Sequence, residues 1–227
     1  MPHKKEYKIK IIKDGPYIIS GNVTLSEKII TPKGRGYEYK EGGELPQAEV
    51  YALCRCGRSK IAPFCDSSHE KTGFDGTETA SRDKYEDRAE LLEGPSVDLM
   101  DDSRCAYARF CHREKGNVWE LTELSDKGNN KEEAVQAASD CPTGRLSAVD
   151  KEGNIIEPSY EPAVDILQDP EKGVSGGIFV KGYIPVEASD GQIYETRNRV
   201  TLCRCGESRN KPFCDAAHVR TGFTDEL

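Results

Sequence analysis

The chain has 227 residues and a net charge of −8; 36% of its residues are hydrophobic, 32% are charged, and the mean hydropathy is −0.69. The negative charge excludes a typical nucleic-acid-binding protein, which needs clustered Lys and Arg, and no stretch approaches the ~18 consecutive apolar residues of a membrane helix. With 21 Gly and 12 Pro, the apolar content is low for one large core, so we expect small modules held together partly by metal sites or covalent links.

In chain order, runs of β-branched and aromatic residues predict strands at 7–12, 17–25, 48–54, 177–187, 192–197 and 199–203. Short helices are expected at 66–71 and 215–220, where Asp66 and Asp215 are positioned to act as N-caps. Residues 129–140 predict the one longer helix, with Asn at its start and acidic residues in its first turn. The predicted fold class is therefore α+β, mainly β with short helices.

An internal repeat organises the chain. Residues 54–74 and 203–223 are identical at 13 of 21 positions without a gap, and 15–23 resembles 176–184 further upstream. The first copy carries about twelve extra residues, which we assign to the Gly-rich stretch 31–46. Two copies of one module thus flank a distinct segment, and we predict domains at residues 1–80, 81–160 and 161–227.

Each copy contains the spacing C-x-C-x8-C-x3-H, which supplies three thiolates and one imidazole. The two quartets are Cys54, Cys56, Cys65 and His69, and Cys203, Cys205, Cys214 and His218. Such a quartet can fill one tetrahedral zinc site or both irons of a [2Fe–2S] cluster, and the spacing alone does not separate these alternatives. Unligated core cysteines are a poor alternative because the quartet occurs intact twice.

The wider pattern is C-x-C-x2-S-x3-P-x-C-D-x2-H, whose other positions are filled by Ser59, Pro63, Asp66, Ser208, Pro212 and Asp215. In this pattern both copies resemble the CDGSH (NEET) iron–sulfur family. The resemblance implies a [2Fe–2S] cluster in each copy, with the close cysteine pair on the inner iron and the Cys/His pair on the outer iron. It also implies two small β-rich modules that pack as an internal pseudo-dimer. The chain departs from the family at the Gly-Ser dipeptide, with Ser67-Ser68 in one copy and Ala216-Ala217 in the other. The resemblance therefore does not determine the geometry of the short helix that begins there.

The histidine ligand leads to two expectations. Neutral imidazole in place of a thiolate raises the reduction potential of a cluster. Protonation of the imidazole competes with iron, so we expect both clusters to become labile below neutral pH, with the outer iron released first.

The middle segment carries the remaining cysteines, Cys105, Cys111 and Cys141, the last followed by Pro142. This arrangement resembles the single-cluster ferredoxins, with Ala108 at the position of the second cysteine of C-x2-C-x2-C. Three cysteines leave one corner of a cube unfilled, which favours [3Fe–4S] in a ferredoxin-like mini-domain. Alternatives are a [4Fe–4S] cluster whose fourth iron is held by His112, Asp140 or water, and plain core cysteines.

Three clusters without a nucleotide, flavin or hydrolase motif favour an electron-transfer protein over an enzyme. The expected partners are redox proteins or apo-protein cluster acceptors, with no nucleic acid and no membrane, and the chain is expected to be a monomer. A cluster carrier or assembly factor, a redox sensor and a zinc-binding interaction module are the alternatives. Without a secretory signal, and with nine cysteines too few and odd in number for a disulfide scaffold, we expect a cytoplasmic protein. The acidic segment 83–102 is either a solvated face or a docking patch for a basic partner.

Overall fold

The computed structural model describes residues 6–225 and confirms a mainly β chain with short helices. The strands are β1 Lys8–Ile11, β2 Tyr17–Ser20, β3 Thr24–Lys33, β4 Gly36–Glu41, β5 Val50–Leu53, β6 Glu90–Leu92, β7 Asp98–Asp101, β8 His112–Arg113, β9 Gly116–Asn117, β10 Leu146–Val149, β11 Ile155–Ile156, β12 Ala163–Asp169, β13 Val174–Lys181, β14 Val186–Glu187 and β15 Arg199–Leu202. The helices are α1 Ser68–Thr72, α2 Tyr85–Arg88, α3 Val118–Glu123, α4 Asn130–Ser139 and α5 Ala217–Thr221. Within residues 6–225, no helix is long and apolar enough to cross a membrane.

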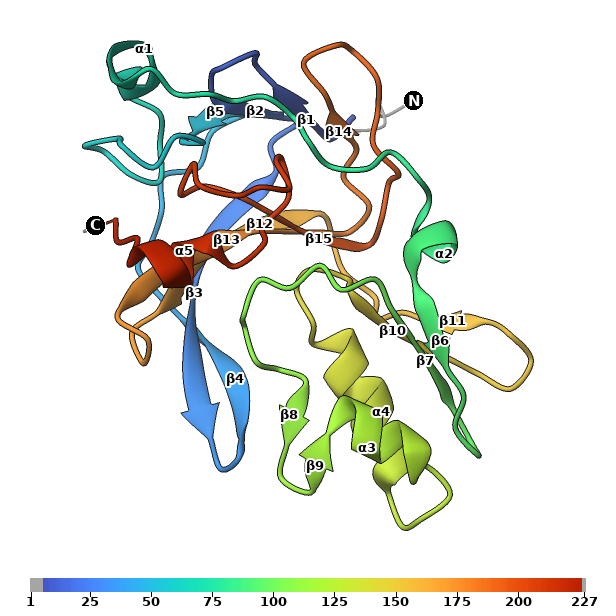
Figure 1. The fold of residues 1–227 in the computed structure, drawn as a ribbon. Coiled ribbons are helices and arrows are strands. Elements are labelled where there is room, and N and C mark those ends of the chain that lie inside the picture. Colours follow the sequence, from blue (N-terminus) through green and yellow to red (C-terminus); the bar gives the residue numbers. More distant parts are fainter. Residues whose placement is uncertain (1–5, 226–227) are drawn as a thin grey trace, which may run out of the picture.

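The two repeats form matching units, which we call the first module (β1, β2, β5 and α1) and the second module (β12, β13, β15 and α5). In each, the middle strand pairs antiparallel with both neighbours: β2 with β1 and β5, and β13 with β12 and β15. The next strand along the chain crosses to the other module, so that β3 pairs in parallel with β12 and β14 pairs in parallel with β1. This reciprocal exchange joins the modules into the expected internal pseudo-dimer (Figure 1).

One apolar core serves both modules. Side chains alternate along the short strands, so every second residue of β2 is buried, and the β-branched residues fill the space between the two sheets. The core includes Ile9, Ile11, Tyr17, Ile19, Leu53, Val164, Ile166, Ile178, Val180 and Leu202, each at most 2% exposed. The modules therefore share their apolar surface and are not two independent cores.

Several strand predictions need correction. The predicted strand 17–25 is broken after Ser20, and Gly21 and Asn22 both adopt positive φ. That break turns the chain toward the other module. No strand forms at 192–197, because Ile193 makes only an isolated bridge and Glu195 instead accepts a hydrogen bond from the backbone N–H of Tyr85.

The extra residues of the first copy form a hairpin. Strand β4 pairs along its whole length with residues 28–33 of β3, and the hairpin extends toward the middle segment (Figure 1). The backbone N–H of Arg35 at its turn donates to Glu114 of the middle segment at 3.1 Å. The insertion therefore links the pseudo-dimer to the segment between the repeats.

The middle segment folds into a four-stranded sheet of order β11-β10-β7-β6 with α3 and α4 packed against it. The predicted helix at 129–140 is confirmed as α4, although Asn129 makes no side-chain capping bond. Helix α3 was not predicted, and the signal for it is a capping box: Asn117 accepts from the N–H of Glu120, whose side chain accepts from the N–H of Asn117.

Candidate metal centres

The ligand quartet of each module is arranged as two pairs. In the first module, the Cys54 and Cys56 sulfurs are 3.7 Å apart, and Cys65 Sγ is 3.5 Å from His69 Nδ1. The second module repeats this arrangement: the Cys203 and Cys205 sulfurs are 3.5 Å apart, and Cys214 Sγ is 3.5 Å from His218 Nδ1. We call the two-cysteine pairs the inner pairs and the Cys/His pairs the outer pairs.

These separations fit two ligands of one tetrahedral metal. With bonds of about 2.3 Å to sulfur and about 2.0 Å to nitrogen, tetrahedral geometry separates two sulfurs by about 3.8 Å and sulfur from nitrogen by about 3.5 Å. In the part of the chain that the structure describes, no group of three or more His, Cys, Asp or Glu side chains is placed to hold one ion. Each module therefore offers two pairs of side chains, each with the spacing of two ligands of one metal.

A tight turn places each outer pair. Ser67 and Ala216, at the glycine position of the motif, adopt left-handed φ values of 66° and 63° and begin α1 and α5. The predicted N-cap role of Asp66 and Asp215 is wrong by one position, because the cap residue is the next one. Both carboxylates still accept from the first helical N–H, at 2.9 and 3.0 Å, so the departure from Gly-Ser leaves the same geometry in both modules.

Backbone N–H groups favour the thiolate form of one cysteine in each inner pair, Cys54 or Cys203, whereas the hydrogen bond to that cysteine and burial raise the pKa of its neighbour, Cys56 or Cys205. The neighbouring thiol of Cys56 and then the N–H groups of Ser59, Gly57 and Arg58 lower the pKa of Cys54 to about 5, although burial opposes this. The corresponding groups of the second module lower the pKa of Cys203 to about 7, again against burial. Thiolate is the form that binds metal, so both loops are prepared for ligation.

The two outer pairs differ in exposure. Cys65 and His69 are partly exposed, whereas Cys214 is 2% and His218 is 3% exposed. Burial, followed by the charge of Arg204, lowers the pKa of His218 to about 4, so its imidazole is neutral at physiological pH. A neutral imidazole is the form that binds metal.

The two ligand loops touch across the pseudo-dimer. A Cβ added to Gly57 would stand 2.5 Å from the carbonyl oxygen of Cys205, and one added to Gly206 would stand 2.6 Å from that of Cys56. Tyr17 of the first module donates to the carbonyl of Cys203 at 2.8 Å. Only glycine allows this close approach of the two loops, and the inner pairs are therefore neighbours.

The three cysteines of the middle segment line one cavity. Its wall contains Cys105, Cys111 and Cys141 together with Ala108. Burial, and then the charges of the other two thiols, raise the pKa of Cys111 to about 11, which reflects their proximity. Neither of the proposed fourth ligands lines this cavity, since His112 is exposed and Asp140 is held by Arg113 and Gln136.

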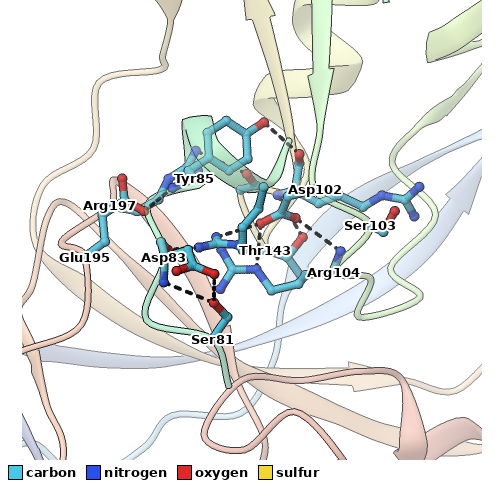
Figure 2. Close-up of polar contacts among 12 residues, drawn as sticks. Ser81, Asp83, Tyr85, Asp102, Ser103, Arg104, Thr143, Glu195 and Arg197 are labelled. Carbon is cyan, nitrogen blue, oxygen red and sulfur yellow. Dashed lines mark hydrogen bonds and ion pairs between the residues drawn. The ribbon is translucent and has the colours of Figure 1, made fainter. Parts of the chain in front are cut away.

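The middle cavity lies next to the second module. Arg104, which precedes Cys105, stands 4.8 Å from the ring of Phe213, which precedes Cys214. Its guanidinium is held by Asp102, a fully buried carboxylate that also accepts from Arg88 (Figure 2). Arg197 lies 3.4 Å from the ring of Tyr85 in the same network. Arginine–aromatic stacking therefore joins the loop of Cys105 to the second module, and the buried carboxylate of Asp102 holds Arg104 in place.

Much of the acidic segment 83–102 is used internally. Asp98 pairs with Lys151, Asp101 with Arg145 and Asp102 with Arg104, at 2.7, 2.5 and 2.6 Å. These carboxylates are not available as a docking patch.

Sequence reasoning missed three buried arginines around these centres: Arg55, Arg199 and Arg204. Arg55 and Arg204 are the middle residues of the two C-R-C triplets, and their identity in both copies was the available signal.

Comparison with known families agrees with this layout. The family described as iron-binding zinc finger CDGSH type matches residues 14–70 and 175–219, which include both quartets. The family described as divergent 4Fe-4S mono-cluster matches residues 92–151, which include the three middle cysteines. No curated protein and no solved structure matches the chain. The chain is thus a tandem CDGSH iron–sulfur protein with a divergent 4Fe-4S-type segment inserted between its two CDGSH modules.

Proposed function

We propose that the chain is an electron-transfer protein with one [2Fe–2S] cluster in each module and one [3Fe–4S] cluster in the middle segment. The proposed ligands are Cys54, Cys56, Cys65 and His69; Cys203, Cys205, Cys214 and His218; and Cys105, Cys111 and Cys141. When bound, such clusters take up and release single electrons.

The observation that carries this proposal is the adjacency of three ligand sets in one chain. The inner pairs meet through Gly57 and Gly206, and the middle cavity meets the second module through Arg104 and Phe213. Adjacent sites suit the passage of electrons between them, whereas independent structural metals do not need to be close.

The paired arrangement supports [2Fe–2S] over structural zinc in the modules. A tetrahedral zinc needs four ligands around one point, while the inner and outer pairs each have the spacing of two ligands on a separate metal. Ala108 supports the three-iron type in the middle segment, because its methyl group lies in the cavity wall where a fourth thiolate would stand.

Iron and acid-labile sulfide analysis of anaerobically purified protein, with EPR before and after reduction, tests the proposal. Seven irons and eight sulfides per chain are expected, with a nearly isotropic signal before reduction and rhombic signals after it. Stoichiometric zinc and no visible absorbance would overturn it. The acid lability of the two histidine-ligated sites stays a prediction; a His69→Cys/His218→Cys variant that bleaches at the same pH as wild type would contradict it.

A cluster carrier is the second candidate, because the outer pair of the first module is partly exposed. Incubation with an apo-ferredoxin separates the two functions. An electron-transfer protein keeps its visible bands through repeated redox cycles, whereas a carrier loses those of the first module to the acceptor.

A further inference from the structure

The arginine of each C-R-C triplet is built into its module in the same way. Arg55 Nε donates to the carbonyl of Gly15, and Arg204 Nε donates to that of Gly176, both at 2.8 Å. Each guanidinium also stands over a phenylalanine ring, at 5.3 and 5.4 Å. Both arginines are 2% exposed, so each C-R-C loop holds a buried positive charge; that of Arg204 acts on Cys54 of the first module as well as on Cys205 and Cys203.

The two arginines differ in their countercharge. Arg204 forms an ion pair with Asp225, and both side chains are almost fully buried. Asp225 is held in place by Gln168, which donates to it at 3.2 Å, and by Ser175, whose hydroxyl accepts from the backbone N–H of Asp225 at 3.0 Å. The second module therefore neutralises its buried cation with a buried anion.

The first module has no such anion. The position equivalent to Asp225 is Gly76, where an added Cβ would stand 2.1 Å from Arg55 Nη2, so no side chain fits. Within residues 6–225, no carboxylate lies within 4.0 Å of Arg55, and its buried Nη1 has no hydrogen-bond partner. Asp75 lies within electrostatic reach of Arg55 but is exposed to water. Asp14, which accepts from the backbone N–H of Gly76 at 2.9 Å, is exposed as well. Within the described residues, Arg55 therefore has no buried carboxylate as an ion-pair partner.

Two other arginines near the second module also have carboxylate partners. Arg109, whose charge reaches His218, makes a two-pronged ion pair with Asp169 at 2.6 and 2.9 Å. Arg104 is held by the buried Asp102. Arg88 shares this carboxylate, so one positive charge of the two arginines stays uncompensated on the side of the middle segment, whereas Arg109 is fully paired.

Other determinants of the potential are matched between the modules. The sulfurs of Cys54 and Cys203 receive backbone N–H groups from equivalent loop residues, among them Gly57 and Gly206. The outer pairs have equal spacing and the same turn. Two differences between the modules, the buried carboxylate of Asp225 and the burial of the second outer pair, both lower the reduction potential of the second module.

We propose that the buried Asp225, absent from the first module, together with burial of the outer pair, gives the second module the lower reduction potential of the two. This inference rests on the proposed [2Fe–2S] sites. Reduction adds negative charge, which Arg55, without a buried ion-pair partner, and nearby water stabilise in the first module. In the second module Asp225 cancels Arg204, and water is excluded from Cys214 and His218. The two modules of one chain are thus unequal, and the first is reduced first.

An EPR-monitored redox titration of the full chain tests this inference. We expect two resolved reduction steps for the [2Fe–2S] signals, and the altered spectrum of a His69→Cys variant assigns the upper step to the first module. Asp225→Asn raises the potential of the lower step and narrows the gap. Arg55→Gln lowers the potential of the upper step, which also narrows the gap between the two potentials. Asp190→Asn, which removes an exposed carboxylate paired with Arg82, leaves both steps in place.

A single step in wild type, or an upper step assigned to the second module, overturns the inference without any variant having to fold. An unmoved lower step in a folded Asp225→Asn protein overturns it as well. These outcomes differ from a failure of the proposed function itself. If the modules held zinc instead of [2Fe–2S] clusters, the titration would show no reducible signal from them.

Discussion

Arg199 joins the second module to the middle segment, and its replacement by methionine tests how much stability depends on that junction. The side chain is 1% exposed. Its Nη1 donates to three carbonyls at the end of α4, those of Ala138, Ser139 and Cys141, at 2.5 to 2.9 Å. Its Nε and Nη2 donate to the carboxylate of Glu157 at 2.9 and 2.7 Å.

The expected loss follows from these partners. Methionine fills a similar volume but leaves the Glu157 carboxylate without its cation and the α4 carbonyls without donors. Removing one partner of a buried ion pair costs about 3–5 kcal/mol, a large share of the ~5–15 kcal/mol that stabilises a folded domain. For a chain of this size, about 2–4 °C are lost per kcal/mol, so the apparent Tm falls by about 6–20 °C.

Thermal unfolding followed by circular dichroism at one fixed scan rate measures this change. Arg58→Met is the matched control, because Arg58 is 64% exposed and its contact with Glu207 is 3.9 Å long; its Tm changes by less than about 2 °C. A loss for Arg199→Met as small as that of Arg58→Met would refute the reasoning.

The decrease in Tm caused by Arg199→Met also depends on pH. Burial by itself would raise the pKa of Glu157, but the hydrogen bonds and charge of Arg199 outweigh burial and leave it below its usual range. The pair's contribution is therefore complete above the unfolded pKa of about 4.3 and is lost as pH falls through the lower folded value. In Arg199→Met burial is opposed only by the hydrogen bond from Asn198 and the charge of Arg197, so the pKa of Glu157 rises and the Tm deficit narrows between about pH 7 and about pH 5. A deficit that does not change over this range contradicts the role of Arg199 as a countercharge.

Three further predictions follow from the metal centres. Ala216→Gly removes the strain of an alanine in the left-handed backbone conformation, which costs about 1 kcal/mol, so the apparent Tm rises by about 2–4 °C. An unchanged or lower Tm would contradict this strain. Ala108→Cys adds a fourth sulfur to the middle cavity. Iron analysis should then find one more iron per chain, and the isotropic EPR signal should disappear. An unchanged iron content would contradict the placement of residue 108 at the fourth ligand position. An iron chelator bleaches the protein in two phases, the faster one altered by His69→Cys and the slower by His218→Cys, because only the first outer pair is partly exposed. Bleaching in a single phase would speak against unequal access.

The local chemistry was readable from the sequence because its determinants are close together in the chain. Spacing alone brings Cys65 to His69 and Cys54 to Cys56, and the structure finds both pairs in contact. Helix α4 was equally predictable, since its signals lie within its own residues. The repeat predicted two similar modules because identical short segments adopt similar folds.

The tertiary structure decided everything that depends on contacts between distant residues. The exchange of β3 and β14 between modules has no local signal, because either partner strand offers the same backbone hydrogen bonds. The two motifs share all four proposed ligands, yet the burial of His218 and the partial exposure of His69 depend on what packs over them. The pairing of Arg204 with Asp225 links residues 21 positions apart, and only the three-dimensional structure shows that no residue among 6–225 forms an ion pair with Arg55. Ligand identity is thus local chemistry, whereas the electrostatic environment of each site is a sum over the whole fold.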